Sequence, residues 1–278
     1  MSAPNAAQIE YWNGKVGERW ARQQQRIDMN LSEIMKTALS FAGVRPGERV
    51  LDVGCGCGST TLALAEAAGP AGAVAGVDIS HPMLEVARAR AAEAGAAIEF
   101  READASDCAF KPEFDLVFSR FGVMFFADPV AAFANIRGAL RPEGRLRFVC
   151  WRTAVENVWA TAPFVAARAL LPPQEAGDPN APGPFAFGDG KRLEGILAAA
   201  GFRDIGIEAF DTVMNMGADP DEAAVEALSI GPLARAAGEV DEATRAKIRE
   251  AVSAMMGQFR TSAGITPPAA CWLVSAAN

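Results

Sequence analysis

A Gly-Cys-Gly-Cys-Gly run at residues 54–58 is the part of the chain best suited to hold a ligand. It follows the apolar run Val50–Val53, typical of a strand buried on both faces, and Ser59 and Thr60 open a helix directly after it. Glycines let the backbone turn sharply and approach a ligand, and the free N–H groups of the helix N-terminus face the same space. The segment predicts a strand, turn and helix that bind a nucleotide.

An acidic residue lies where the second strand of such a unit should end. The strand is expected over residues 73–78, and Asp78 follows Gly54 by about 24 positions, close to the spacing of about 20 for ribose-binding acids. A carboxylate there can accept hydrogen bonds from both hydroxyls of an adenosine ribose. The glycine spacing departs from the G-x-G-x-x-G of dinucleotide sites, which disfavours a nicotinamide-dependent oxidoreductase, one of two alternatives to the interpretation below.

With the preceding Leu51-Asp52-Val53, the glycine run resembles the first motif of the class I S-adenosylmethionine-dependent methyltransferases. Asp78, the segment 102–105 and the strand expected at 114–119 resemble later motifs of this family, in the same order. The likeness is firm over about residues 45–151 and is strongest to bacterial enzymes that methylate quinones, sterols and secondary metabolites. It implies an α/β fold: a Rossmann-like, doubly wound, mostly parallel sheet with an antiparallel terminal strand.

The resemblance also implies S-adenosyl-L-methionine as cofactor and a contact for each of its parts. The glycine turn would hold the methionine part, Asp78 the ribose, and Asp104 with Ala105 the adenine. A structural role for Asp52 beneath the turn and a core role for Ile79 and Met83 remain open. The full set of expected cofactor contacts is Tyr11, Asp52, Gly54, Cys55, Gly56, Asp78, Ile79, Met83, Asp104, Ala105 and Ser119.

The end of the fourth expected strand bears on the methyl acceptor. It lacks the [DN]-P-P-[YF] motif common in enzymes that methylate amide or adenine nitrogen. Arg120 can bind an anionic acceptor group or the cofactor carboxylate, or stay solvated, and Phe121 indicates an apolar, aromatic neighbour. We expect a small, apolar or aromatic acceptor that contacts Arg120, Phe121, Met124, Trp159, Phe185 and Leu228.

No side chain stands out as a general base, so the catalytic group is unknown, with His81, Arg120 and Tyr11 as candidates. His81, the only histidine, is better explained as a loop residue near the adenosine than as a base. The missing base keeps a second alternative open, a non-catalytic cofactor-binding module. Five cysteines without paired zinc or disulfide spacing predict no metal site.

Strands and helices alternate along the chain, which predicts a parallel sheet. Helices are expected at 8–29, 31–42, 60–68, 83–94 and 129–140, and strands at 50–53, 73–78, 98–101, 116–119, 145–150, 205–210 and 270–274. Residues 1–45 are expected to form an N-terminal helical lid in which Tyr11 either touches the ligands or packs on the core. Residues 46–151 form the cofactor core, and 152–278 complete it.

Two segments, 152–188 and 215–268, exceed what this fold needs. The first carries a helix expected near 158–171, and the second carries helices expected near 221–228 and 241–259. Both should begin beyond the carboxyl ends of the parallel strands, where ligands bind in open α/β sheets. We therefore expect them to form the walls of a substrate pocket. A homodimer contact or helical padding is the competing explanation.

Composition excludes several other classes of partner. The chain of 278 residues carries a net charge of −8, which disfavours binding to nucleic acid or to an anionic membrane. Its first residues lack the cationic and apolar segments of an export signal, and apolar runs fall short of the about 20 residues of a membrane span. We expect a cytoplasmic protein.

Overall fold

The structure is a computed structural model that describes residues 5–173, 177–238 and 240–278. Its main sheet has the strand order β3-β2-β1-β4-β5-β9-β6. Neighbouring strands from β3 to β5 are parallel, whereas β9 runs antiparallel to both β5 and β6. The strands are β1 (Arg49–Val53), β2 (Ala73–Asp78), β3 (Glu99–Glu102), β4 (Phe114–Arg120), β5 (Leu140–Trp151), β6 (Arg203–Val213) and β9 (Pro268–Ala277). The expected doubly wound sheet with an antiparallel terminal strand is confirmed.

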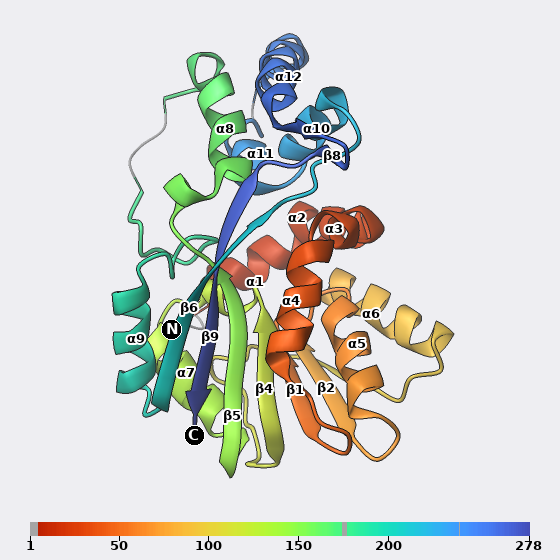
Figure 1. Ribbon diagram of the computed structural model, residues 1–278, viewed down its shortest axis with the longest axis vertical. Coiled ribbons are helices and arrows are strands. Elements are labelled where there is room, and N and C mark those ends of the chain that lie inside the picture. Colours follow the sequence, from red (N-terminus) through yellow and green to blue (C-terminus); the bar gives the residue numbers. More distant parts are fainter. Residues whose placement is uncertain (1–4, 174–176, 239) are drawn as a thin grey trace.

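Helices cover both faces of the sheet (Figure 1). Helices α4 (Ser32–Ala42), α5 (Ser59–Ala68) and α6 (His81–Glu93) lie on one face, and α7 (Pro129–Arg137) and α9 (Gly190–Ala199) lie on the other. Leu51, Leu116, Phe118 and Phe148 are fully buried between these layers. Each such side chain contributes about 1.5–3 kcal/mol when it leaves water, so the strands that carry the glycine turn sit in a rigid core.

The N-terminal segment differs from the single helix expected at 8–29. It forms α1 (Ala6–Asn13), α2 (Lys15–Arg22) and α3 (Gln24–Asn30). The first break lies at Gly14, whose backbone is extended (φ −89°, ψ −157°), and the second lies at Gln23. At Gly17 an added Cβ would lie 1.8 Å from the Trp12 carbonyl oxygen and 2.9 Å from Ser80 Oγ, so a larger residue there would force this part of the segment to move.

The helix expected at 129–140 is too long by three residues. Helix α7 begins at the Asp128 cap, whose carboxylate accepts from the Ala131 N–H, and ends at Arg137. Leu140 already belongs to β5, where it is the partner of Phe114. Residues 141–144, which separate the expected helix from the expected strand, therefore lie inside the long strand.

Both segments beyond the minimal fold form helices above the carboxyl ends of the parallel strands (Figure 1). The first contains α8 (Val158–Ala167), and the second contains α10 (Pro220–Ala227), α11 (Gly231–Ala236), α12 (Glu242–Met256) and the short pair β7 (Arg260–Thr261) and β8 (Gly264–Ile265). Helix α8 packs against α10, α11 and α12, so the two insertions form one cap. Helix α11 was not expected. Across the described ranges, no helix is both long and apolar enough to cross a membrane.

Candidate functional site

The glycine turn is shaped by contacts between backbone atoms. Gly54 has φ +68°, and a Cβ added there would lie 2.5 Å from the Cα of Gly122, on the loop after β4. The N–H groups of Gly54 and Cys55 donate to the Val77 carbonyl at 2.8 and 3.2 Å. The glycine expected to make room for a ligand thus also makes room for residue 122, which brings the loops after β1 and β4 together.

Asp78 joins this turn to the loop after β2. Its Oδ2 accepts from the Gly56 N–H at 2.8 Å, and its Oδ1 accepts from the Ser80 N–H at 2.8 Å. Burial raises the pKa of the carboxyl, while these N–H groups act to lower it. A carboxylate oxygen can accept two hydrogen bonds, so each oxygen keeps capacity for a ligand hydroxyl. Asp78 therefore keeps acceptor capacity beside the glycine turn, and its role in ribose binding stays a prediction.

Asp104 offers an unused acceptor at the tip of the neighbouring strand. Its Oδ1 accepts from the Ser106 N–H at 2.8 Å and from Asn5 Nδ2 at 3.1 Å. Its Oδ2 is buried and has no hydrogen-bond partner among the described residues. A buried polar atom without a partner is costly, and an exocyclic amine would satisfy it. Ala105 beside it is buried, with its carbonyl accepting from Asn135 Nδ2 at 3.0 Å.

Asp52 lies fully buried beneath the glycine turn. Its Oδ2 accepts from the hydroxyls of Thr60 and Thr61 at 2.6 and 2.8 Å, so the acid fixes the first turn of α5. Its Oδ1 has no partner in the described part of the chain. Burial raises the pKa of Asp52 to about 6, against the lowering effect of the two hydroxyls and of Arg120. The structural interpretation is supported, and one oxygen remains free.

The other residues expected to contact the cofactor differ in burial and in hydrogen bonding. The buried Ser119 hydroxyl donates to the Val53 carbonyl at 2.7 Å and accepts from the Gly122 N–H, so it links β4 to β1. Cys55 is also buried, and burial raises the pKa of its thiol. Ile79 is half-buried, and Met83 is buried with its Cε 2.7 Å from where a Gly56 Cβ would lie. Met83 thus covers the glycine turn.

Arg120 ends β4 and carries unused hydrogen-bond donors. Its Nε and Nη1 are buried and find no acceptor among the residues described, and burial lowers the pKa of the guanidinium. The carboxylates of Asp28 and Asp52 partly offset this through charge. Buried cations are nearly always paired, so these donors suit an anionic or strongly accepting ligand group. Solvation, the competing interpretation of Arg120, does not fit two buried nitrogens.

Next to Arg120 the backbone adopts an uncommon conformation. Phe121 has φ +64°, which strains a bulky residue and is concentrated at functional sites. Its ring stacks on Trp151 at 4.1 Å between centroids and 10° between planes, and Trp151 meets Trp159 at 5.0 Å. Three rings thus lead from the tip of β4 to the cap. Trp151 was not among the residues expected here, although it directly follows the expected strand.

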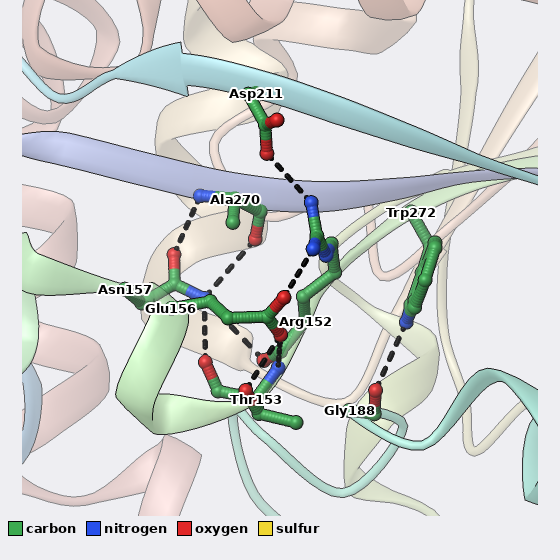
Figure 2. Close-up of polar contacts among 8 residues, drawn as sticks. All are labelled: Arg152, Thr153, Glu156, Asn157, Gly188, Asp211, Ala270 and Trp272. Carbon is green, nitrogen blue, oxygen red and sulfur yellow. Dashed lines mark hydrogen bonds and ion pairs between the residues drawn. The ribbon is translucent and has the colours of Figure 1, made fainter.

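The buried Asn157 fixes the cap end of this aromatic column, and Figure 2 shows its contacts with Ala270 and Thr153. Asn157 Oδ1 accepts from Trp159 Nε1 at 3.0 Å and from the Ala270 N–H at 2.9 Å. Its Nδ2 donates to the carbonyls of Ala270 and Thr153 at 3.0 and 3.1 Å. Arg152 beside it pairs with Glu156 and with Asp211, which joins β6 to the same corner. Asn157 has no sequence signal beyond its place before a helix.

Trp159 and Leu228, two of the expected pocket walls, lie in the cap, where the side chains pack closely together. Trp159, Met216 and Leu233 line a cavity of only about 10 Å³ between the insertions, close to the size that holds one water molecule. Leu228 is buried, whereas Phe185 is half-buried against the core. Met124 is also buried, and its carbonyl accepts from the Gly183 N–H.

The N-terminal lid reaches the tips of β2, β3 and β4. Asn13 Nδ2 donates to the Ile79 carbonyl at 2.7 Å, its Oδ1 accepts from the His81 N–H, and Asn5 Oδ1 accepts from the Ala127 N–H at 2.8 Å. Tyr11, 39% exposed, packs edge-on against Trp12, which fits the packing interpretation. Sequence reasoning missed both asparagines.

Among the three catalytic candidates, His81 is the one whose position fits a general base least well. It opens α6 beside the tip of β3, where its exposed ring contacts Glu102, with 2.7 Å between Nδ1 and Oε2. This position is beside β3 and not at the tip of β4. The contact fits the loop-residue interpretation of His81, whereas the candidate Arg120 is the last residue of β4.

Comparison with known proteins shows that the part of the chain with the glycine turn is similar to methyltransferases. Residues 50–144 match the family model of a methyltransferase domain. Nocamycin O-methyltransferase of Saccharothrix syringae is 38% identical over 41% of this chain and 41% of its own length. Demethylmenaquinone methyltransferase of Staphylococcus aureus is 36% identical over 54% of this chain and 62% of its own. The chain thus spans less than two thirds of the length of these relatives.

A solved structure shows the same fold over the whole chain. Phosphoethanolamine N-methyltransferase 2 of Haemonchus contortus, in complex with S-adenosyl-L-methionine, aligns with a TM-score of 0.57 and 19% identity. The alignment covers 100% of this chain and 60% of that protein. The family match falls on β1 to the first part of β5, the part that holds the glycine turn, Asp78, Asp104 and the tip of β4.

Proposed function

We propose that this chain, whose residues 50–144 match a methyltransferase domain, transfers the methyl group of S-adenosyl-L-methionine to a small organic acceptor. The observation that carries the proposal is a pair of unsatisfied carboxylate oxygens. Among the described residues, Asp52 Oδ1 and Asp104 Oδ2 are buried without hydrogen-bond partners at the carboxyl ends of β1 and β3, and Asp78 ends β2, the strand between them. A ligand with an amino group near the glycine turn, a ribose at Asp78 and an adenine amine at Asp104 would donate hydrogen bonds to all three carboxylates.

The cofactor supplies an activated methyl group on a sulfonium. The protein has to hold an acceptor nucleophile about 3 Å from that carbon, in line with the bond that breaks. Gly54 and Gly56 shape the surface beside which the methionine part binds, and Asp78 and Asp104 fix the adenosine. The lid contacts of Asn5 and Asn13 cover this side of the crevice and exclude water.

The acceptor is proposed to be a planar, mostly apolar molecule with an acidic hydroxyl or another anionic group. The stacked rings of Phe121 and Trp151 offer a flat apolar surface, and the adjacent Arg120 offers two unused N–H donors. An acceptor bound there as its anion needs no general base, since Arg120 stabilises the ionised form. The names of the two relatives, which refer to nocamycin and demethylmenaquinone, support a small-molecule acceptor.

Two experiments test this function against the alternatives. Calorimetry should detect binding of S-adenosyl-L-methionine and none of NADH, and the reverse result would favour an oxidoreductase. Turnover should then be measured on a panel of phenols, quinols, thiols and amines. We expect methylation within the phenol and quinol group, lost in Arg120→Gln while cofactor affinity stays within about twofold of wild type. Cofactor binding without turnover on any member would favour the non-catalytic module.

The remaining expectations about partners and location are part of the proposal. The acidic chain is proposed to act in the cytoplasm on a free small molecule, without nucleic acid or membrane as partner. A homodimer remains the alternative use of the apolar helix faces in the cap. Size-exclusion chromatography with light scattering, over a range of protein concentrations, distinguishes the monomer from the dimer.

A further inference from the structure

Helix α3 touches two parts of the molecule that are separate in sequence and in proposed role. Arg26 and Asn30, four residues apart, share one face of the helix, and Asp28 lies about 200° around the axis from Arg26. Arg26 and Asn30 face α10 in the cap, and Asp28 faces the start of α5 beside the glycine turn. The short helix therefore bridges the cap and the cofactor turn.

The contact with the cap is a buried charged cluster. The Glu226 side chain is only 1% exposed; its Oε2 lies 2.5 Å from Arg26 Nε, and its Oε1 accepts from Asn30 Nδ2 at 2.6 Å. Arg26 Nη2 also donates to the Glu222 carbonyl at 3.2 Å, and the Asn215 N–H donates to the Asn30 carbonyl at 3.3 Å. Separating α3 from the cap would leave the Glu226 carboxylate buried without its partners, which is strongly unfavourable.

The contact with the cofactor turn is a second polar cluster. Asp28 Oδ1 accepts from the Ser59 hydroxyl, and Asp28 Oδ2 lies 3.2 Å from Arg90 Nη2. Arg90 Nη1 in turn donates to the Cys57 carbonyl at 2.8 Å and to Ser59 Oγ at 3.0 Å. All of these bonds converge on residues 57–59, where the glycine turn passes into α5. Asp28 is also one of the carboxylates whose charge acts on Arg120.

We propose that Asp28 is a positioning residue of the cofactor site, and that α3 couples the cap to the glycine turn through Asp28 and Glu226. The proposal rests on the proposed function, because it takes the turn as the binding surface for the methionine part of the cofactor. Since polar clusters on two opposite faces of α3 have specific partners, a shift of the helix at the cap would disturb residues 57–59. Cofactor affinity should therefore depend on Glu226, which touches the lid and not the turn.

The test uses S-adenosylhomocysteine as the probe and measures its dissociation constant by calorimetry in the full-length protein. Asp28→Asn should weaken binding about fivefold and Glu226→Gln about threefold, within the range of measured coupling between sites. The double variant should be no weaker than about fivefold, because both changes act through one helix. Arg22→Gln is the matched control, since Arg22 pairs with Glu18 on the exposed side of α2 and its variant should bind as wild type does.

A second probe separates positioning from general loss of structure. 5′-Methylthioadenosine lacks the amino-acid part that the turn would hold, so its affinity should change less than about twofold in Asp28→Asn. Equal losses for both probes, wild-type affinity in Glu226→Gln, or fully additive effects in the double variant would overturn the proposal. If Glu226→Gln fails to fold, Asn30→Ala tests the same contact. Wild-type protein that binds neither probe would instead refute the proposed function.

Discussion

At the carboxyl ends of β1 and β2, the backbone of the glycine turn sets the geometry: Gly54 lies against Gly122, and the Gly56 N–H donates to the Asp78 carboxylate. At the β4–β5 end, side chains set it, with the Phe121, Trp151 and Trp159 rings held in a column by packing. Backbone contacts leave little freedom for substitution, whereas packed rings tolerate exchange for other rings of similar volume. The proposed cofactor end should therefore be intolerant of substitution, and the proposed acceptor end should tolerate it.

The largest effect is expected at the contact between the two glycines. Gly54→Ala combines a positive φ with a Cβ 2.5 Å from the Cα of Gly122, and we expect it to cost about 2–5 kcal/mol of unfolding free energy. Gly43→Ala is the control, because Gly43 has φ +57° but its Cβ would meet nothing closer than 3.8 Å. That variant should lose about 1–2 kcal/mol. Urea denaturation measures both, and equal losses would show that the Gly122 contact costs nothing.

The next effect concerns the acid beneath the turn and depends on pH. Because burial raises the pKa of Asp52 from 3.8 to about 6, the folded protein binds more protons than the unfolded chain between about pH 4 and pH 6. The contribution of Asp52 to unfolding free energy therefore falls as pH rises through this window. Relative to wild type, Asp52→Asn should gain about 2 kcal/mol between pH 4 and pH 7. A pH-independent difference between the two proteins would contradict the buried carboxyl.

A third prediction concerns Asp78 and the affinity for the cofactor product. Asp78→Ala removes two acceptors of backbone N–H groups and the proposed ribose contact. We expect S-adenosylhomocysteine affinity to fall at least about tenfold, as for hydrogen bonds to a charged group worth about 1.5–3 kcal/mol. Calorimetry on protein shown to be folded by circular dichroism measures it. Unchanged affinity in the folded variant would remove Asp78 from the ribose site.

Local sequence was enough to predict the core of the fold. The glycine run, Asp78 at a strand tip and the alternation of strands with helices depend on residues close together in the chain, and β2 was placed with its observed bounds. The length of α7 could not be predicted, because Leu140 leaves the helix to pair with Phe114. That pairing is a long-range contact, which local propensity does not contain.

The acceptor side of the site was harder to predict for the same reason. Arg120 and Phe121 were expected there because they follow a strand, but the positive φ of Phe121 and its stacking on Trp151 arise only when β4 and β5 pair. Asn5 and Asn13 touch strand tips far away in sequence, so no local pattern marks them. Asp28 and Glu226 likewise acquire their partners only in the folded chain.

The smallest effect is expected in the aromatic column. Trp159→Phe keeps an aromatic ring against Trp151 but removes the hydrogen bond from Nε1 to Asn157, whose Oδ1 still accepts from the Ala270 N–H. We expect a loss of about 1 kcal/mol of unfolding free energy, the usual worth of one such bond, and S-adenosylhomocysteine affinity within about twofold of wild type. Trp272→Phe, which removes the bond from Nε1 to the Gly188 carbonyl, is the matched control. A loss of cofactor affinity of about tenfold in Trp159→Phe would show that the aromatic column and the glycine turn are coupled. The proposed acceptor end would then not tolerate substitution independently of the proposed cofactor end.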